Sequence, residues 1–284
     1  MDRQSNYFPV LGIHEFRNHP SEGCDLIFHE LHGKRSIGQP HKHDFFIIIL
    51  FEKGEGSHTI DFIRYETGSR QVHLVFPGQV HQWELESQTV GYQLMIGREW
   101  FESFLPDLRF PAFSYYHHPV LEAPDEVFTL LISEFRSIQS ELKKESVFRE
   151  IVKTRSRLIC LLISRLAAAD PENFEKFYPN PLTSKFLALI EDHFREERSV
   201  AFYAEKLHIS PNYLNIICRR HMQVSASSLI YNRVLLEAKR LLGGSEMSVK
   251  DIFYKLGFYD NSSFSNFFRI RTGMTPSQFK MQRH

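Results

Sequence analysis

The sequence predicts a multi-domain protein: an antiparallel β-barrel with helices after it, followed by an all-α domain with two helix-turn-helix motifs. Three observations support this prediction. Residues 45–83 are rich in Phe, Ile, Val and Tyr and are interrupted by glycine-containing turns, a pattern typical of short strands. Helical spacing of apolar residues dominates after residue 97. Residues 170–182 contain three prolines and are expected to form a linker, because proline cannot continue a helix.

The composition is that of a globular protein. Of 284 residues, 42% are hydrophobic and 24% are charged, which is typical of folded domains. No stretch reaches the ~18 consecutive apolar residues that a membrane-spanning helix needs, and residues 1–10 lack the apolar core of a signal peptide. Cys24, Cys160 and Cys218 are too far apart for a metal or redox motif, so we expect reduced thiols. We therefore expect a cytoplasmic protein with no membrane partner.

The barrel is expected to occupy residues 1–97. Turns at residues 53–56, 67–69 and 77–78 divide this segment into short strands with little helical periodicity. Residues 98–169 change pattern, and apolar positions there predict long helices. The linker over 170–182 then leads into a helical domain over residues 183–284.

The helical domain begins with a helix and a first helix-turn-helix motif. Apolar residues from Phe186 to Phe194 recur at spacings that place them on one helix face. After a short helix and a brief turn, Ser210 and Pro211 suit the N-cap and first position of a new helix, since Ser can accept a free N–H and Pro has none to donate. This helix, residues 211–220, has an outward face able to reach base edges or phosphates. Its outward residues are Asn212, Tyr213, Asn215, Arg219 and Arg220.

A second motif of the same kind follows a long helix over residues 225–242. That long helix is expected to end at Gly243–Gly244, where glycine tolerates a left-handed C-cap. Ser248 and Asp251 predict a capping box for the next helix, and Gly257 permits the sharp turn after it.

A second recognition helix is predicted over residues 261–271. Its outward side chains are Ser262, Ser263, Ser265, Asn266, Arg269 and Arg271. Gly273 is expected to stop this helix, and Thr275 and Gln278 predict a capping box for a last short helix. The repetition of helix, turn and polar helix makes the pattern more specific than a single helix-turn-helix.

These residues resemble the signature of AraC/XylS-type regulators over about 100 residues. The matching runs are Ser210–Pro211, Tyr213–Leu214, Ala238, Leu256–Phe258, Asp260, Ser262, Phe264, Phe268–Arg269 and Gly273–Ser277. Three positions depart from the family pattern: Cys218 replaces Phe, Gln223 replaces Gly, and Phe253 replaces Ala. We interpret them as compensated packing changes, which protein cores tolerate.

The resemblance implies a protein that binds double-stranded DNA. In this family the linking helix holds both recognition helices on one side of the duplex, about one helical turn (~34 Å) apart, so that each enters a successive major groove. The helical domain carries fifteen basic and nine acidic residues, a net charge of +6, which agrees with a polyanionic partner. The helices over 98–169 are expected to dimerise the protein, as similar helices do in relatives; the alternative is packing against the barrel.

The N-terminal segment resembles a cupin barrel through residues 41–46, 54–56 and 76–83. Metal-binding cupins use a His-x-His pair, a following Glu and a later His, and here Ile47 and Ile48 occupy the places of the Glu. We therefore expect no metal and no cofactor, although three histidines could still hold an incidental metal. His41, His43, His81 and Trp83 are instead predicted to contact a small-molecule effector.

Three function classes remain open. The first is a ligand-responsive transcriptional regulator, a homodimer whose partners are DNA, a small-molecule effector and RNA polymerase. The second is a metal-dependent cupin enzyme with an accessory DNA-binding domain. The third is an architectural DNA-binding protein without a sensor. The missing Glu, and the lack of a nucleophile–base arrangement, phosphate loop or dinucleotide motif, favour the first class and predict that the chain is not an enzyme.

Overall fold

Strand β5 (Phe46–Lys53) forms the centre of the N-terminal unit. The computed structural model describes residues 10–13, 26–37, 39–110, 112–170, 174, 181–222, 224–245 and 247–281. The apolar run of β5 is buried on both faces. Phe46, Ile48 and Leu50 join a core with the helices, whereas Ile47 and Ile49 join a second core between two sheets. Successive side chains of a strand point to opposite faces, so an uninterrupted apolar run is what a doubly covered strand requires.

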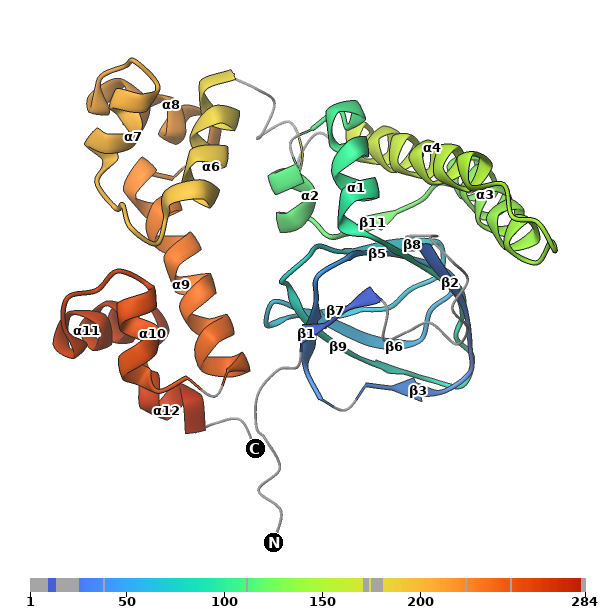
Figure 1. Ribbon diagram of the computed structural model, residues 1–284, viewed down its shortest axis with the longest axis horizontal. Coiled ribbons are helices and arrows are strands. Elements are labelled where there is room, and N and C mark those ends of the chain that lie inside the picture. The colour runs from blue at the N-terminus through green and yellow to red at the C-terminus, as the bar shows by residue number, and fades with distance from the viewer. Residues whose placement is uncertain are drawn as a thin grey trace, which may run out of the picture. The chain divides into compact units, whose positions relative to one another are not determined.

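The described strands hydrogen-bond into two sheets (Figure 1). One sheet has the order β11-β8-β5-β10-β2, and the other has β1-β4-β9-β6-β7 with β3 beside β9. All described pairs are antiparallel except β1 with β4. The bounds are β1 Val10–Leu11, β2 Leu26–His32, β3 Arg35–Ser36, β4 His41–His43, β6 Gly56–Ile60, β7 Ile63–Glu66, β8 Gln71–Val75, β9 Val80–Leu85, β10 Val90–Ile96 and β11 Val120–Glu122. The predicted antiparallel β domain is confirmed, and its two sheets face each other across one core.

Helices cover the outer face of the β11-β8-β5-β10-β2 sheet (Figure 1). They are α1 (Arg98–Phe104), the 3-10 turn η2 (Leu105–Asp107), α2 (Ala112–His117), α3 (Asp125–Leu142) and α4 (Arg149–Ala168). Helices α3 and α4 pack against each other, and both bury apolar residues in the core with the sheet. Packing against the β domain, the alternative to dimerisation, therefore accounts for one face of each helix.

The C-terminal unit is all helical, as predicted. Its helices are α6 (Pro181–His193), α7 (Val200–Lys206), α8 (Pro211–Met222), α9 (Ala226–Gly244), α10 (Val249–Lys255), α11 (Asn261–Thr272) and α12 (Pro276–Met281). The long helix α9 joins the two helix-turn-helix motifs and packs against α8 and α10 (Figure 1). Arg233 of α9 ties α6 to this framework through an ion pair with Glu191 (2.8 Å), and it also pairs with Glu237 within α9 (3.1 Å). Most of the predicted linker, residues 170–182, lies outside the described residues.

The capping predictions are mostly confirmed. Ser248 and Asp251 form the predicted capping box, and Thr275 and Gln278 exchange the same pair of bonds. Gly273 ends α11 in the left-handed conformation, with φ of 75°.

One cap prediction is wrong. Helix α9 continues through Gly243 and Gly244, and Ser245 follows it in an extended conformation. The Ser245 hydroxyl donates to the carbonyl of Leu241 (2.8 Å). A side chain therefore satisfies a carbonyl at the helix end that a left-handed glycine turn would otherwise serve.

Two of the three cysteines lie in the described part of the chain, and both are buried, as expected for structural thiols. Burial raises the pKa of Cys218 to about 11, which leaves its thiol protonated and unreactive. Cys24 lies outside the described residues. None of the described helices is long and apolar enough to cross a membrane.

Candidate nucleic-acid interface and ligand-binding domain

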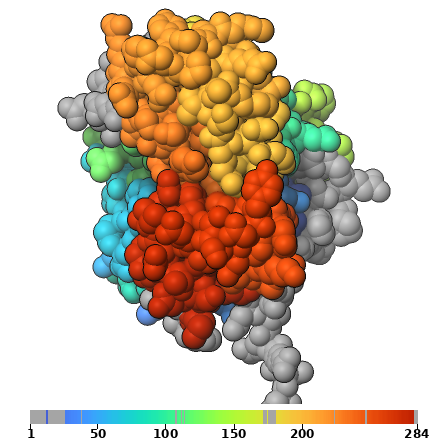
Figure 2. Space-filling view, turned by 90° about the vertical axis from the view of Figure 1, so that its left-hand side faces the viewer, coloured from blue at the N-terminus to red at the C-terminus, as the bar shows by residue number. Residues whose placement is uncertain are grey.

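The two helix-turn-helix motifs close their turns with the same hydrogen bonds. In the first, the amide of Ile209 donates to the carbonyl of Ala204 (3.0 Å). In the second, the amide of Phe258 donates to the carbonyl of Phe253 (2.9 Å). The positions differ by 49 residues in each pair, whereas the helices that follow begin 50 residues apart, so the second motif has one more residue between the turn and its helix. Figure 2 shows them on one face of the helical unit, the first in orange above the second in red.

The recognition helices α8 and α11 also expose corresponding positions. From the first residue of each helix to the tenth, the sequence of exposed, half-buried and buried residues is identical. Leu214, Ile217 and Cys218 in α8, and their counterparts Phe264, Phe267 and Phe268 in α11, face the core. The predicted inward faces of both helices are confirmed, and Arg219 corresponds to Arg269. Two residues predicted to face outward, Asn215 and Ser265, are half-buried.

Most of the predicted DNA-contacting side chains are exposed. They are Asn212, Tyr213, Arg219, Arg220, Ser262, Ser263, Asn266, Arg269 and Arg271. The guanidinium of Arg271 lies over the rings of Tyr231 (4.7 Å) and Phe267 (4.4 Å). This stacking holds the Arg271 charge close to α9 at the end of the recognition helix.

Two predicted contacts have roles inside the protein. Asn215 accepts a bond from the amide of Ala226 (3.1 Å) at the start of α9, and its own amide donates to the carbonyl of Pro211 (3.2 Å). Ser265 is half-buried and donates to Asn261 (3.3 Å). Asn215 therefore braces α8 against the linking helix, which is a tertiary role that its polar character in the sequence did not reveal.

The sequence interpretation overlooked Ile216. This residue lies between the polar positions of α8, is 52% exposed, and corresponds to Asn266 in α11. An exposed aliphatic side chain on a recognition helix can contact the methyl group of thymine. The available signal was its helical position, two residues after Leu214, which points it away from the buried stripe.

The turns differ in one residue that carries strain. His208 and Gly257 occupy corresponding positions with φ of 55° and 69°, a conformation that costs a residue with a Cβ roughly 1 kcal/mol. We expect His208→Gly to stabilise the helical unit by about 1 kcal/mol. The measurement is urea unfolding followed by circular dichroism. Because His208 is exposed, a destabilised variant would show that its imidazole makes a compensating contact.

The four residues predicted to bind an effector lie together between the sheets. His41 and His43 project from β4, and His81 and Trp83 from β9, all at most 5% exposed. Two further histidines join them, His58 from β6 and His73 from β8. Burial lowers the pKa of His43 and His73 to about 3 each, and lowers the pKa of His58 and His81 well below the ordinary value. These imidazoles are therefore neutral at physiological pH.

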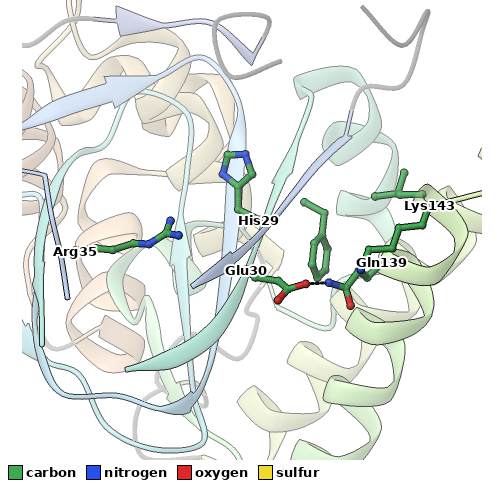
Figure 3. A pocket seen from close by; sticks show the side chains of 7 residues that line it. His29, Glu30, Arg35, Gln139 and Lys143 are labelled. Atoms are coloured by element: carbon green, nitrogen blue, oxygen red, sulfur yellow. Dashed lines mark hydrogen bonds between the residues drawn. The ribbon is translucent and has the colours of Figure 1, made fainter. Parts of the chain in front are cut away.

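A pocket of about 460 Å³ lies outside this cluster, at the junction of β2 with α3. Its lining residues are Phe28, His29, Glu30, Arg35, Gln139, Leu142 and Lys143. Figure 3 shows Glu30 reaching Gln139 of α3, while His29 and Arg35 lie on the other side of β2. The sequence interpretation missed this pocket because β2 and α3 are about a hundred residues apart in the chain.

A β domain with a pocket, joined to a duplicated helix-turn-helix, defines a DNA-binding regulator with a sensor domain. Two family models match the chain: "AraC-like ligand binding domain" over residues 23–152 and "Helix-turn-helix domain" over residues 203–282. The chain belongs to the AraC/XylS-type family of transcriptional regulators.

Relatives match this chain over most of its length. The HTH-type transcriptional activator RhaS of Escherichia coli O139:H28 is 26% identical over 259 residues, which cover 86% of this chain and 87% of RhaS. RhaS of Citrobacter koseri is 24% identical with the same coverage. Among solved structures, fatty-acid-bound ToxT of Vibrio cholerae is 15% identical, covering 90% of this chain and 94% of ToxT, with a TM-score of 0.43.

Proposed function

We propose that this regulator reads two adjacent DNA half-sites, one with α8 and one with α11, and that a small molecule bound by its β domain controls this binding. The observation that carries the proposal is the identical exposure pattern of the two helices, with Arg219 and Arg269 at corresponding outward positions. Paired recognition helices on one linking helix favour binding to a duplex whose half-sites are one turn apart.

The α3–α4 pair supports dimerisation as part of this function. Both helices bury one face against the sheet, and four aliphatic residues on them remain 39–43% exposed. These are Leu130, Ile151, Leu158 and Leu161. A second copy that covers this surface would remove it from water. A dimer would then present two pairs of recognition helices to DNA.

The pocket at β2 and α3 suits a small polar effector with an acidic group. Arg35 and Lys143 supply positive charge from the two sides of β2 and outnumber the single carboxylate of Glu30, while His29 supplies a ring nitrogen and Leu142 and Phe28 supply apolar surface. Cationic side chains at a half-open site favour carboxylates or phosphates through charge-assisted hydrogen bonds. The prediction that the buried His41, His43, His81 and Trp83 bind the effector stays a prediction.

The relatives' activity extends the proposal to the cell. Because RhaS is a transcriptional activator, we propose that this chain activates transcription in the cytoplasm, through contact with RNA polymerase, and has no enzymatic activity of its own. The test is selection of bound genomic fragments with and without candidate metabolites. We expect a shared site of two short half-sites spaced by about one helical turn. Fragments without a common sequence would contradict the proposal and favour an architectural role.

Effector binding is tested separately with a thermal-shift screen of organic acids and sugar derivatives. A ligand of the pocket is expected to lose about tenfold in affinity in Arg35→Ala, because a hydrogen bond to a charged group contributes about 1.5–3 kcal/mol. Lys34→Ala is the matched control, since Lys34 is adjacent, 73% exposed and outside the pocket lining. An effector whose affinity is the same for both variants and for the parent binds outside this pocket.

A further inference from the structure

The buried histidines form one continuous chain of hydrogen bonds across the interior of the β domain. His43 Nε2 lies 2.7 Å from His81 Nε2, His81 Nδ1 lies 3.0 Å from His58 Nε2, and His58 Nδ1 lies 3.1 Å from His73 Nδ1. His73 Nε2 then lies 3.1 Å from Gln71 Oε1. The chain begins in the sheet that holds β4, β6 and β9 and ends in the sheet that holds β8.

Gln71 determines the tautomer of three histidines in this chain. Its Oε1 accepts the amide N–H of Gly68 (2.7 Å), so the oxygen and not the NH₂ group faces His73. An oxygen only accepts, so neutral His73 must donate from Nε2 and accept at Nδ1. His58 then donates from Nδ1 and accepts at Nε2. His81 therefore donates from Nδ1, and its Nε2 carries a lone pair directed at His43.

His41 is fixed in the same way. Its Nδ1 lies 3.3 Å from the carbonyl oxygen of Gln39, which can only accept, so the lone pair of neutral His41 is on Nε2. The rings of His41, His43 and His81 lie 4.5–4.7 Å apart between centroids. One ring nitrogen from each of the three lies within 4.8 Å of the other two. Ring nitrogens this close together can share a single metal ion, as imidazoles do in zinc sites.

We propose that His41, His43 and His81 form a binding site for a divalent transition-metal ion, with His58, His73 and Gln71 as the residues that orient it. Three imidazoles without a carboxylate suit zinc, for which Zn–N distances of about 2.0–2.1 Å place the nitrogens about 3.3 Å apart. To bind the ion, the Nε2 atoms of His43 and His81, now 2.7 Å apart, must separate by roughly half an ångström. The proton of His43 then moves from Nε2 to Nδ1, which frees Nε2 to bind the metal. A hydrogen bond from the far nitrogen of a ligating histidine is the usual way to fix a metal ligand.

This inference replaces the expectation from the sequence that the domain binds no metal. The sequence offered three histidines without the cupin Glu, and that absence argued against a metal. The structure adds a buried relay from His58 to Gln71, which holds His81 in the ligating tautomer. The proposal concerns the β domain alone and does not depend on DNA binding or on the organic effector.

Zinc titration of the chelator-treated full chain tests the proposal. We expect one zinc ion per chain, a melting temperature that rises with zinc concentration, and a visible spectrum of the Co²⁺-loaded protein that indicates nitrogen ligation. His81→Ala is expected to abolish this binding. His73→Leu, which removes an orienting residue and no ligand, is expected to weaken it about 10–100-fold.

The exposed histidine His32 provides the matched control, because His32→Ala removes an imidazole that lies outside the cluster. Circular dichroism of each variant shows that the chain is folded. No zinc binding by the folded parent chain would overturn the proposal. Equal zinc affinity in His81→Ala and the parent would also overturn it, since the ion would then be held elsewhere.

Discussion

Gly257→Ala is expected to destabilise the helical unit by about 3 kcal/mol or more. A Cβ at this position would lie 2.2 Å from the carbonyl oxygen of Arg195, and the backbone there has a φ of 69°. Backbone strain and a backbone clash therefore add. The turn cannot easily move, because Arg198 also donates to the carbonyl of Leu256 and stacks on Phe258 at 3.7 Å.

The two tryptophans make this measurement specific. Trp83 and Trp100 both belong to the N-terminal unit, so tryptophan fluorescence reports that unit while circular dichroism also follows the C-terminal helices. In urea unfolding, Gly257→Ala should lower the midpoint of the transition of the C-terminal helices and leave the transition followed by tryptophan fluorescence unchanged.

Gly273→Ala is the matched control for this substitution. Gly273 has a similar φ of 75°, but a Cβ there meets nothing within 4 Å. We expect it to cost about 1 kcal/mol. Equal losses in the two variants would show that the contact with Arg195 contributes nothing.

Replacing Arg219 and Arg269 together by Ala is expected to lower DNA affinity roughly a hundredfold at low salt. Each lost phosphate contact removes about 0.9 from the slope of log affinity against log salt, so the slope should become shallower by about two units. Both side chains are exposed on the outward faces of their helices, so the fold should be unchanged. Fluorescence anisotropy with labelled duplex over a range of salt concentrations measures both quantities.

Lys185→Ala controls for the loss of positive charge, because Lys185 is exposed on α6, outside both motifs. It should leave the salt dependence close to that of the parent. The single variants separate the half-sites, and each should remove about one unit of slope. A double variant with the parent's slope would show that neither arginine contacts phosphate.

Features formed by residues close together in the chain were readable from the sequence. The capping pairs Ser248–Asp251 and Thr275–Gln278 lie three residues apart, and their bonds form wherever a helix begins. The alternation of inward and outward residues on α8 and α11 follows from helix geometry in the same way. These local rules were sufficient to predict the duplicated motif and the fold class.

Features formed by distant residues were decided by the tertiary structure. His81 meets His58, 23 positions away, and His43, 38 positions away, because the register between β4, β6 and β9 brings them together in one sheet. The packing of the second sheet then adds His73. Asn215 bonds to Ala226 because α8 ends against α9. A one-residue change of register would turn these strand side chains to the opposite face. The sequence by itself therefore determined the two recognition helices, whereas sheet pairing and packing decided which histidines share one buried site.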